Sequence, residues 1–213
     1  AAARGRYVFF ADADDVMSTE ALRRMVEFAD AHGSDVVVPK MVGVGRVVIS
    51  STYDRTAADA FLPLVLRTLT PQKLFRRSML IEHGMRFPEE KVRLEDGMMI
   101  VPAYFKARRV SVLGDYDYYH LRAHPEGHNI SSGRLDPEGY TWSIGEVSRL
   151  IIDHDPDPAR AALLVLDLYA RKCLKMYEPE RFARMPDSRR DEWIQQHQAH
   201  IAKYVPVELD AEL

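Results

Sequence analysis

The chain has 213 residues, of which 46% are apolar and 29% charged, and its formal net charge is −3. This composition is ordinary for a folded globular protein, so extensive disorder is excluded, and the balanced charge does not indicate a partner nucleic acid. No run of about 18 apolar residues occurs, so no transmembrane segment is expected. The single cysteine excludes an internal disulfide framework and fits a cytoplasmic protein. A peripheral position at the inner membrane face is a further expectation.

The first 120 residues alternate strand-like and helix-like segments, which predicts an α/β architecture. Residues 7–11 form an apolar run of strand length that we expect to be buried on both faces. An amphipathic helix capped by Ser18 and ended by Gly33 follows it. Later residues predict a helix over 94–107 and strands over 35–39, 46–49, 73–75, 110–113 and 116–119.

The pattern of predicted elements changes near residue 136. Asp136 and Pro137 form a typical start of a helix, and helices are expected to about residues 153, 177 and 204. We therefore expect an α/β part over residues 1–135 and a helical appendage or linker over 136–213.

Three carboxylates directly follow the first predicted strand: Asp12, Asp14 and Asp15. Ionised carboxylates this close repel one another and are costly to desolvate without a compensating positive charge. A divalent cation such as Mn²⁺ or Mg²⁺ supplies that charge and completes its shell with water and substrate phosphates. The end of a strand in an open sheet is also where α/β proteins bind ligands. The simpler interpretation is an acidic turn that precedes a helix.

A second acidic feature, Glu95-Asp96, begins the helix predicted over residues 94–107. One interpretation is that an acid here only complements the helix dipole. The other is that it acts as a general base, which requires a carboxylate within reach of a substrate hydroxyl.

Several basic and polar side chains could bind an anionic substrate. Arg122, His124 and Ser131 belong to a predicted loop and offer donors to a phosphate, although a solvated loop is the alternative. The spacing of its histidines is that of a zinc site on a helix, but Pro125 and Gly127 argue against a helix there. Further candidates are the cations at Lys73, Arg76, Arg77, Lys91 and Arg93.

Three hypotheses of different classes follow. Asp12 to Val16 match the start of a haloacid-dehalogenase-like phosphatase, with Asp12 as nucleophile and Asp14 as general acid, but the late acidic pair of that family is not found. A non-catalytic interaction fragment is the second hypothesis.

The third hypothesis explains more of the chain, because an ordered set of segments over about residues 4–135 resembles family 2 glycosyltransferases of the GT-A fold. That fold is Rossmann-like, with a mostly parallel sheet and helices, here partial and followed by an α-helical C-terminal region. The tail resembles bacterial wall-teichoic-acid sugar transferases. The segments that carry the family resemblance are residues 5–15, 33–37, 73–77, 84–89, 94–96 and 111–116.

The resemblance implies an inverting glycosyltransferase. It implies that Asp14 binds Mn²⁺ or Mg²⁺, that Asp12 contacts the nucleotide-sugar or the metal shell, and that Asp96 is the catalytic base. The donor is expected to be a UDP-sugar and the acceptor a hydroxyl group, with an anionic cell-wall polyol-phosphate polymer as a candidate. The helical tail is a candidate surface for oligomerisation. Further substrate contacts are assigned to Glu95, Arg93, Arg76, Arg122, His124 and Ser131.

One departure from the family leads to an additional expectation. In this family the first strands of the fold hold the nucleotide, and no segment of this chain matches those strands. We therefore expect a fragment that starts within the catalytic domain, keeps the metal and base residues, and binds the donor poorly.

Overall fold

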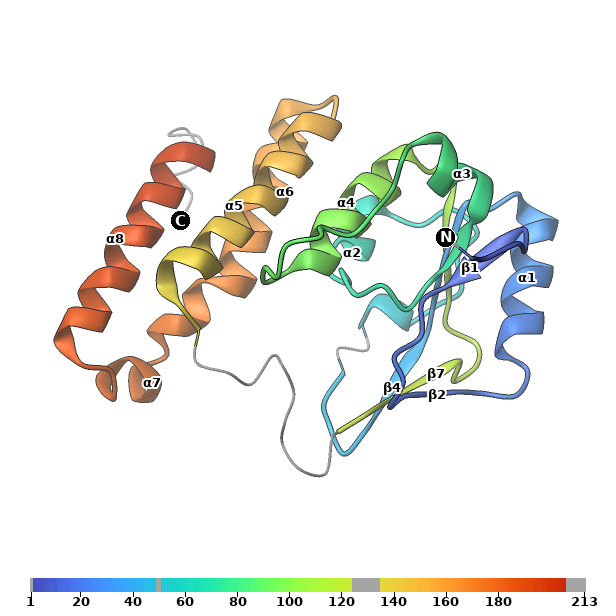
Figure 1. The fold of residues 1–213 in the computed structure, drawn as a ribbon, viewed down its shortest axis with the longest axis horizontal. Coiled ribbons are helices and arrows are strands. Elements are labelled where there is room, and N and C mark those ends of the chain that lie inside the picture. The colour runs from blue at the N-terminus through green and yellow to red at the C-terminus, as the bar shows by residue number, and fades with distance from the viewer. Residues whose placement is uncertain (1, 49–50, 124–134, 206–213) are drawn as a thin grey trace. The chain divides into compact units, whose positions relative to one another are not determined.

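A computed structural model describes residues 2–48, 51–123 and 135–205 (Figure 1). The chain forms two compact units. The first comprises Ala1–Arg86 and Ala103–Gly133, and the second comprises Phe87–Pro102 and Arg134–Leu213. Residues 87–102, which precede the boundary expected at 136, are thus grouped with the helical residues.

The first unit contains a four-stranded sheet in the order β1-β5-β3-β6. β1 pairs antiparallel with β5, β5 pairs antiparallel with β3, and β3 pairs parallel with β6. The α/β class is confirmed, but the pairing is mixed, where the sequence predicted a mostly parallel sheet. The strands are β1 (Tyr7–Phe9), β3 (Val36–Pro39), β5 (Leu74–Arg76) and β6 (Val110–Leu113).

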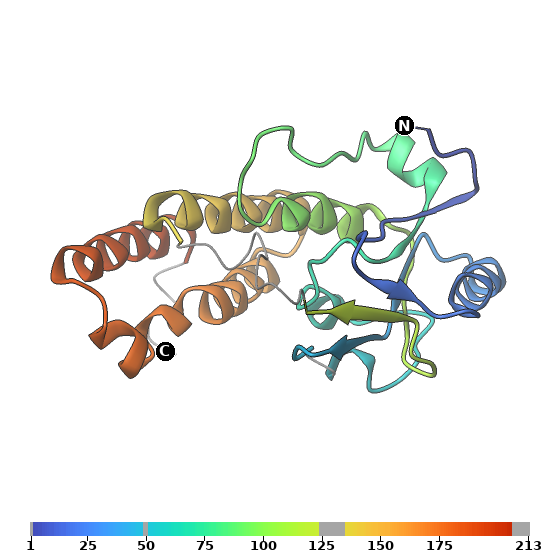
Figure 2. The same cartoon turned by 60° about the horizontal axis from the view of Figure 1, so that its bottom comes forward.

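A smaller sheet in the same unit has the order β2-β7-β4. β7 (Tyr119–Arg122) lies in the middle, antiparallel to β2 (Val16–Met17) and parallel to β4 (Met41–Val44). Figure 2 shows β7, in yellow-green, beside β4, in blue. Of the strand expected over residues 46–49, residues 46–48 are not in a strand and residue 49 lies outside the described residues; the nearest strand is the earlier β4. The strand expected over 116–119 begins only at Tyr119.

The position of β1 in the sheet corrects one expectation about burial. Tyr7, Val8 and Phe9 are half-buried, whereas a strand covered on both faces was expected. The reason is that β1 is an edge strand of the four-stranded sheet in the described part of the chain.

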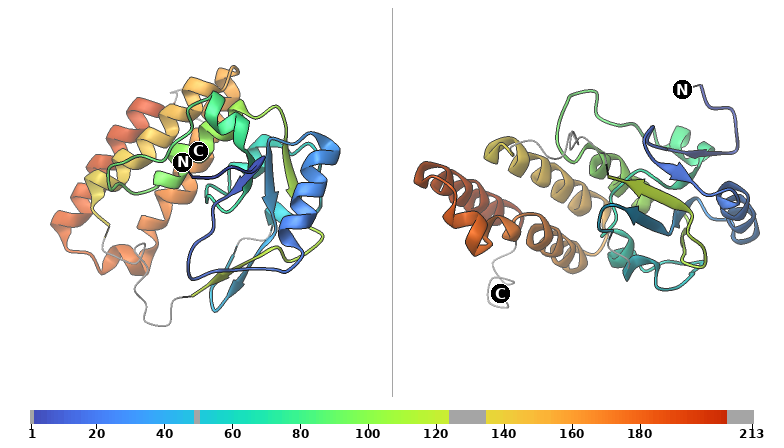
Figure 3. Two further views of the ribbon diagram at one scale, coloured as in Figure 1. Left: turned by 45° about the vertical axis from the view of Figure 1, so that its right-hand side comes forward. Right: turned by 90° about the horizontal axis from the view of Figure 1, so that it is seen from below.

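Helix α1 (Ala21–His32) packs against the four-stranded sheet (Figure 3). Its buried face consists of Ala21, Met25 and Ala29, which cluster with residues of β3 and β5. It ends at Gly33, whose φ of 66° is left-handed and favours glycine. Ser18 is not its cap, because the Ser18 hydroxyl donates to the carbonyl of Asp117.

Shorter helices complete the first unit: η1 (Ser51–Tyr53), α2 (Leu62–Val65) and α3 (Arg77–Glu82). α4 (Glu95–Lys106) begins in the second unit and ends in the first. It confirms the helix expected over residues 94–107.

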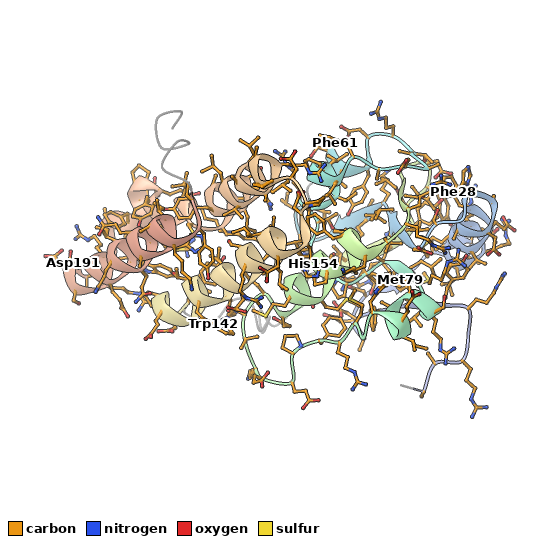
Figure 4. All side chains as sticks on the ribbon, turned by 90° about the horizontal axis from the view of Figure 1, so that it is seen from above. Phe28, Phe61, Met79, Trp142, His154 and Asp191 are labelled. Carbon is orange, nitrogen blue, oxygen red and sulfur yellow. The ribbon has the colours of Figure 1, made fainter. Side chains whose placement is uncertain are left out.

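The second unit is helical, as expected. α5 packs against both α6 and α8, and Figure 4 shows side chains filling the space among these helices. Asp136 and Asp157 cap α5 and α6 by accepting backbone N–H groups. No helix in the described ranges is long and apolar enough to cross a membrane. The elements are α5 (Pro137–His154), α6 (Pro158–Lys172), η3 (Leu174–Tyr177), α7 (Pro179–Ala183) and α8 (Asp187–Tyr204).

Candidate active site

Residues 12–15 form a tight turn, here called the acidic turn, between β1 and β2. The N–H of Asp15 points at the carbonyl of Asp12 across the turn, at 3.4 Å. The carboxylates of Asp12, Asp14 and Asp15 offer oxygens that lie within 4.8 Å of one another. Within the described ranges, no other group of three or more His, Cys, Asp or Glu side chains comes close enough to hold a metal ion.

Three hydrogen bonds from distant parts of the first unit hold the acidic turn. Gln72 Nε2 donates to Asp12 Oδ2 at 2.7 Å, and the Asp12 N–H donates to the Tyr119 hydroxyl at 2.9 Å. The N–H of Arg122 donates to Asp15 Oδ1 at 2.9 Å. Strand register explains why these residues meet, since Phe9 pairs with Leu74 near Gln72, and Met17 pairs with Tyr119.

The acidic turn carries concentrated negative charge. Burial raises the pKa of the Asp12 carboxyl, and the charges of Asp15 and Asp14 raise it further, while the hydrogen bond from Gln72 acts in the opposite direction. Burial also raises the pKa of the Tyr119 phenol, so its hydroxyl stays protonated at neutral pH. A hard divalent cation binds carboxylate oxygens and relieves this repulsion, so the donor set fits Mn²⁺ or Mg²⁺.

The predicted base residues occupy the start of α4. Glu95 is exposed, Asp96 is half-buried, and both lie in the first helical turn, where the helix dipole stabilises negative charge. Leu94, which precedes them, has a φ of 57°, an uncommon value for a residue other than glycine. Arg93 is close enough to Tyr140 of α5 to influence its phenol electrostatically. All of these residues belong to the second unit, whereas the acidic turn belongs to the first.

The remaining predicted contacts are placed differently. Arg76 lies opposite Tyr7, at the end of β1 away from the acidic turn, and its Nε donates to Asp35 Oδ1 at 2.7 Å. The structure therefore does not bring Arg76 to the acidic turn. Arg122 reaches it through its backbone, and its side chain is exposed. His124 and Ser131 lie outside the described residues.

Comparison with known proteins gives the family. A family model described as glycosyl transferase family 2 matches residues 1–116, more than half of the chain. The chain belongs to glycosyl transferase family 2. A second model, described as the glycosyl transferase TarS linker domain, matches residues 137–213.

Two named glycosyltransferases are similar to this chain. The poly(ribitol-phosphate) beta-glucosyltransferase of Bacillus spizizenii is 35% identical over 166 residues, which are 76% of this chain and 26% of that protein. The poly(ribitol-phosphate) beta-N-acetylglucosaminyltransferase TarS of Staphylococcus aureus is 39% identical over 152 residues, which are 70% of this chain and 26% of that protein. The chain thus spans about a quarter of the length of these two relatives.

The similarity extends to the fold. The crystal structure of S. aureus TarS 1-349 in complex with UDP-GlcNAc matches with a TM-score of 0.86 at 30% sequence identity, covering 98% of this chain and 60% of that chain. The family and GT-A fold expected from the sequence are confirmed. The match favours a family 2 enzyme over the haloacid-dehalogenase-like phosphatase.

Sequence reasoning missed two residues that contact the acidic turn, Gln72 and Tyr119. Gln72 stands alone in its segment and has no local pattern that marks it. Tyr119 belonged to a predicted strand, and only its pairing opposite Met17 shows that it reaches Asp12. Both contacts arise from chain segments far from residue 12, so no spacing rule could have found them.

Proposed function

We propose that this chain is part of an inverting glycosyltransferase that moves a sugar from a UDP-sugar to a hydroxyl group of an anionic polyol-phosphate polymer. The observation that carries the proposal is the acidic turn, with three carboxylates within 4.8 Å, in a chain of family 2. The polymer is suggested by the names of the two relatives, and the donor by the UDP-GlcNAc bound to TarS.

The acidic turn is proposed to bind the donor side of the reaction. Asp14 would hold Mn²⁺ or Mg²⁺, with Asp12 and Asp15 beside it, and Asp12 would also contact the nucleotide-sugar. When bound, the cation would neutralise charge on the leaving diphosphate. The backbone N–H of Arg122 and the amide of Gln72 orient the carboxylates for this task.

Asp96 is proposed as the general base. Its carboxylate takes the proton of the acceptor hydroxyl while that oxygen bonds to the anomeric carbon and the bond from that carbon to the diphosphate oxygen breaks. Attack opposite the leaving group inverts the anomeric configuration. The start of α4 favours the ionised carboxylate that such a base requires.

We propose fewer substrate-contacting residues than the sequence suggested. Glu95, Arg93 and the Arg122 side chain stay candidates for substrate contacts. Arg76 is left out, because its guanidinium donates to Asp35 and to the Ser34 carbonyl. We propose residues 1–135 as catalytic and 136–213 as a linker, with the reaction on the cytoplasmic side of the membrane.

The proposal is tested by sugar transfer from a UDP-sugar to poly(ribitol phosphate), measured in the longest protein that contains this chain. Asp96→Asn should lower kcat by about 100-fold or more, because general-base catalysis contributes about that much. Asp153→Asn, at an exposed carboxylate of α5, is the control and should leave transfer unchanged. Full activity in Asp96→Asn would remove Asp96 as the base.

A second assay separates this function from the phosphatase hypothesis. Hydrolysis of an aryl phosphate that disappears in Asp12→Asn would favour the phosphatase. Transfer of sugar without such hydrolysis would support the glycosyltransferase.

A further inference from the structure

We propose that Tyr119 and Gln72 are positioning residues, which hold the carboxylates of the acidic turn in the arrangement that binds a divalent cation. The inference rests on the proposed function, because it takes the acidic turn as the metal site. It adds two uncharged side chains that neither the sequence nor the family match assigns.

Tyr119 anchors the first acid of the acidic turn. Its side chain is buried, with 1% of the residue exposed, and its ring packs against Phe9 of β1 at 5.4 Å between centroids. Its hydroxyl accepts the Asp12 N–H at 2.9 Å. One rigid, buried phenol therefore fixes the backbone of the first acid, while the Arg122 N–H holds the carboxylate of the last.

Gln72 fixes the Asp12 carboxylate from the other side. The residue is 3% exposed, and its Nε2 donates to Asp12 Oδ2 at 2.7 Å. Its Oε1 is buried and has no hydrogen-bond partner among the described residues. An unsatisfied buried oxygen destabilises a fold, so packing alone does not explain a glutamine here. The amide fits a site in which a bound water or substrate hydroxyl supplies the missing donor.

The choice of uncharged donors suits a cation site. A lysine or arginine bonded to Asp12 would orient its carboxylate but would also neutralise the charge that attracts the metal. The Gln72 amide and the Arg122 backbone N–H orient the carboxylate oxygens, the Tyr119 phenol holds the Asp12 backbone, and all three leave the negative charge in place. Side chains that orient metal ligands in this way commonly change metal affinity by about 10–100-fold when they are removed.

Tyr118 offers a matched control for Tyr119. It is the preceding residue, it is equally buried at 1% exposure, and its hydroxyl lies 3.0 Å from Asp115 Oδ1. Tyr118→Phe therefore removes a hydroxyl from the same unit without removing a contact of the acidic turn. Gln72→Met keeps the length of the side chain and removes its donor.

The experiment titrates the chain with Mn²⁺ alone and follows the loss of the free-ion signal by electron paramagnetic resonance. Thermal melting without metal is recorded for each variant as a check of folding. Tyr119→Phe and Gln72→Met should each weaken Mn²⁺ binding by about tenfold or more. Tyr118→Phe should bind as the wild type does, and Asp14→Asn should lose binding.

The stability readout distinguishes positioning from a purely structural role. Gln72→Met removes both the unsatisfied oxygen and the hydrogen bond to Asp12, whose exposed carboxylate can bond water instead. Its melting temperature should therefore stay close to that of the wild type while it binds Mn²⁺ more weakly. Wild-type affinity in folded Tyr119→Phe and Gln72→Met would overturn the inference. Weakening by Tyr118→Phe to the same extent would also overturn it.

Failure of the inference differs from failure of the proposed function. If Mn²⁺ binds with wild-type affinity in both positioning variants but is lost in Asp14→Asn, the metal site stands and the inference fails. If the wild type binds no Mn²⁺, the metal assignment and the inference fail together. If Mn²⁺ binding behaves as expected while transfer is insensitive to Asp96→Asn, only the catalytic base is wrong.

Discussion

The buried carboxylate of Asp35 accepts hydrogen bonds from both the backbone N–H and the guanidinium of Arg108, at 3.0 Å and 2.9 Å. Arg76 donates to the same carboxylate. Asp35 precedes β3, Arg76 ends β5, and Arg108 precedes β6, so a single carboxylate ties together three neighbouring strands of the first unit.

This ion pair predicts an acid-sensitive contribution to stability. Burial raises the pKa of Asp35, but the hydrogen bonds from Arg108 and Arg76 outweigh it and hold the pKa at about 2. Because the folded pKa is below the unfolded one, the stabilisation is complete above about pH 4 and is lost as the pH falls to about 2. Asp35→Asn should lower the free energy of unfolding by roughly 2 kcal/mol at pH 7.

Urea unfolding at pH 7 and at pH 2.5 measures this difference. Glu27→Gln, at an exposed carboxylate that pairs with Arg23, is the matched control and should change stability by less than about 0.5 kcal/mol. Equal stability of Asp35→Asn and the wild type at pH 7 would contradict the prediction.

The second unit should lose stability in a different pH range, because His197 and His200 of α8 are buried. Burial lowers the pKa of each to about 4, and for His200 the charges of His197 and Lys203 act in the same direction. Both ring nitrogens of His200 lack partners among the described residues, and its ring stacks on Tyr169. The folded state binds fewer protons than the unfolded state, so stability falls as the pH drops from about 6.5 to about 4.

Replacing His200 by phenylalanine tests this expectation. The substitution removes no hydrogen bond seen among the described residues. The free energy of unfolding of the variant should depend less on pH, and at pH 4.5 it should exceed that of the wild type by up to about 3 kcal/mol. Fluorescence reports the transition, since the buried Trp193 lies 5.3 Å from the His197 ring.

Local patterns predicted much of the fold because they depend on neighbouring residues. The Asp136-Pro137 start of α5 and the Gly33 end of α1 both follow from local backbone chemistry. Strand partners could not be predicted in this way. The mixed sheets and the half-buried β1 depend on pairing between segments far apart in the chain, and so do the contacts that Gln72 and Tyr119 make with Asp12.

The sequence does not indicate that Leu94 adopts an unusual backbone conformation. Leucine rarely adopts a φ of 57°, yet its carbonyl accepts the Met98 N–H at 3.2 Å at the start of α4. Leu94→Gly should preserve transfer and change the free energy of unfolding by no more than about 1 kcal/mol, since glycine adopts this φ without strain. Leu94→Val should destabilise by about 1–2 kcal/mol and lower kcat, because a β-branched residue resists this φ and Asp96 lies two residues further on.

The comparison of these two variants is made with thermal melting and transfer kinetics on the same preparations. If Leu94→Val and Leu94→Gly have the same melting temperature and the same kcat, the start of α4 does not depend on this backbone conformation.

Removal of divalent cations should abolish sugar transfer. Asp14 is exposed in the acidic turn, so a bound cation can exchange with a chelator such as EDTA. Adding Mn²⁺ or Mg²⁺ after dialysis should restore the rate of the wild type but not that of Asp14→Asn, because the substitution removes one of the three carboxylates that hold the ion. Asp117→Asn is the control, since Asp117 pairs with Lys40 at 2.7 Å and is not part of the acidic turn. A rate that EDTA leaves unchanged over a full day of dialysis would exclude a required metal and leave the acidic turn to bind the substrate directly.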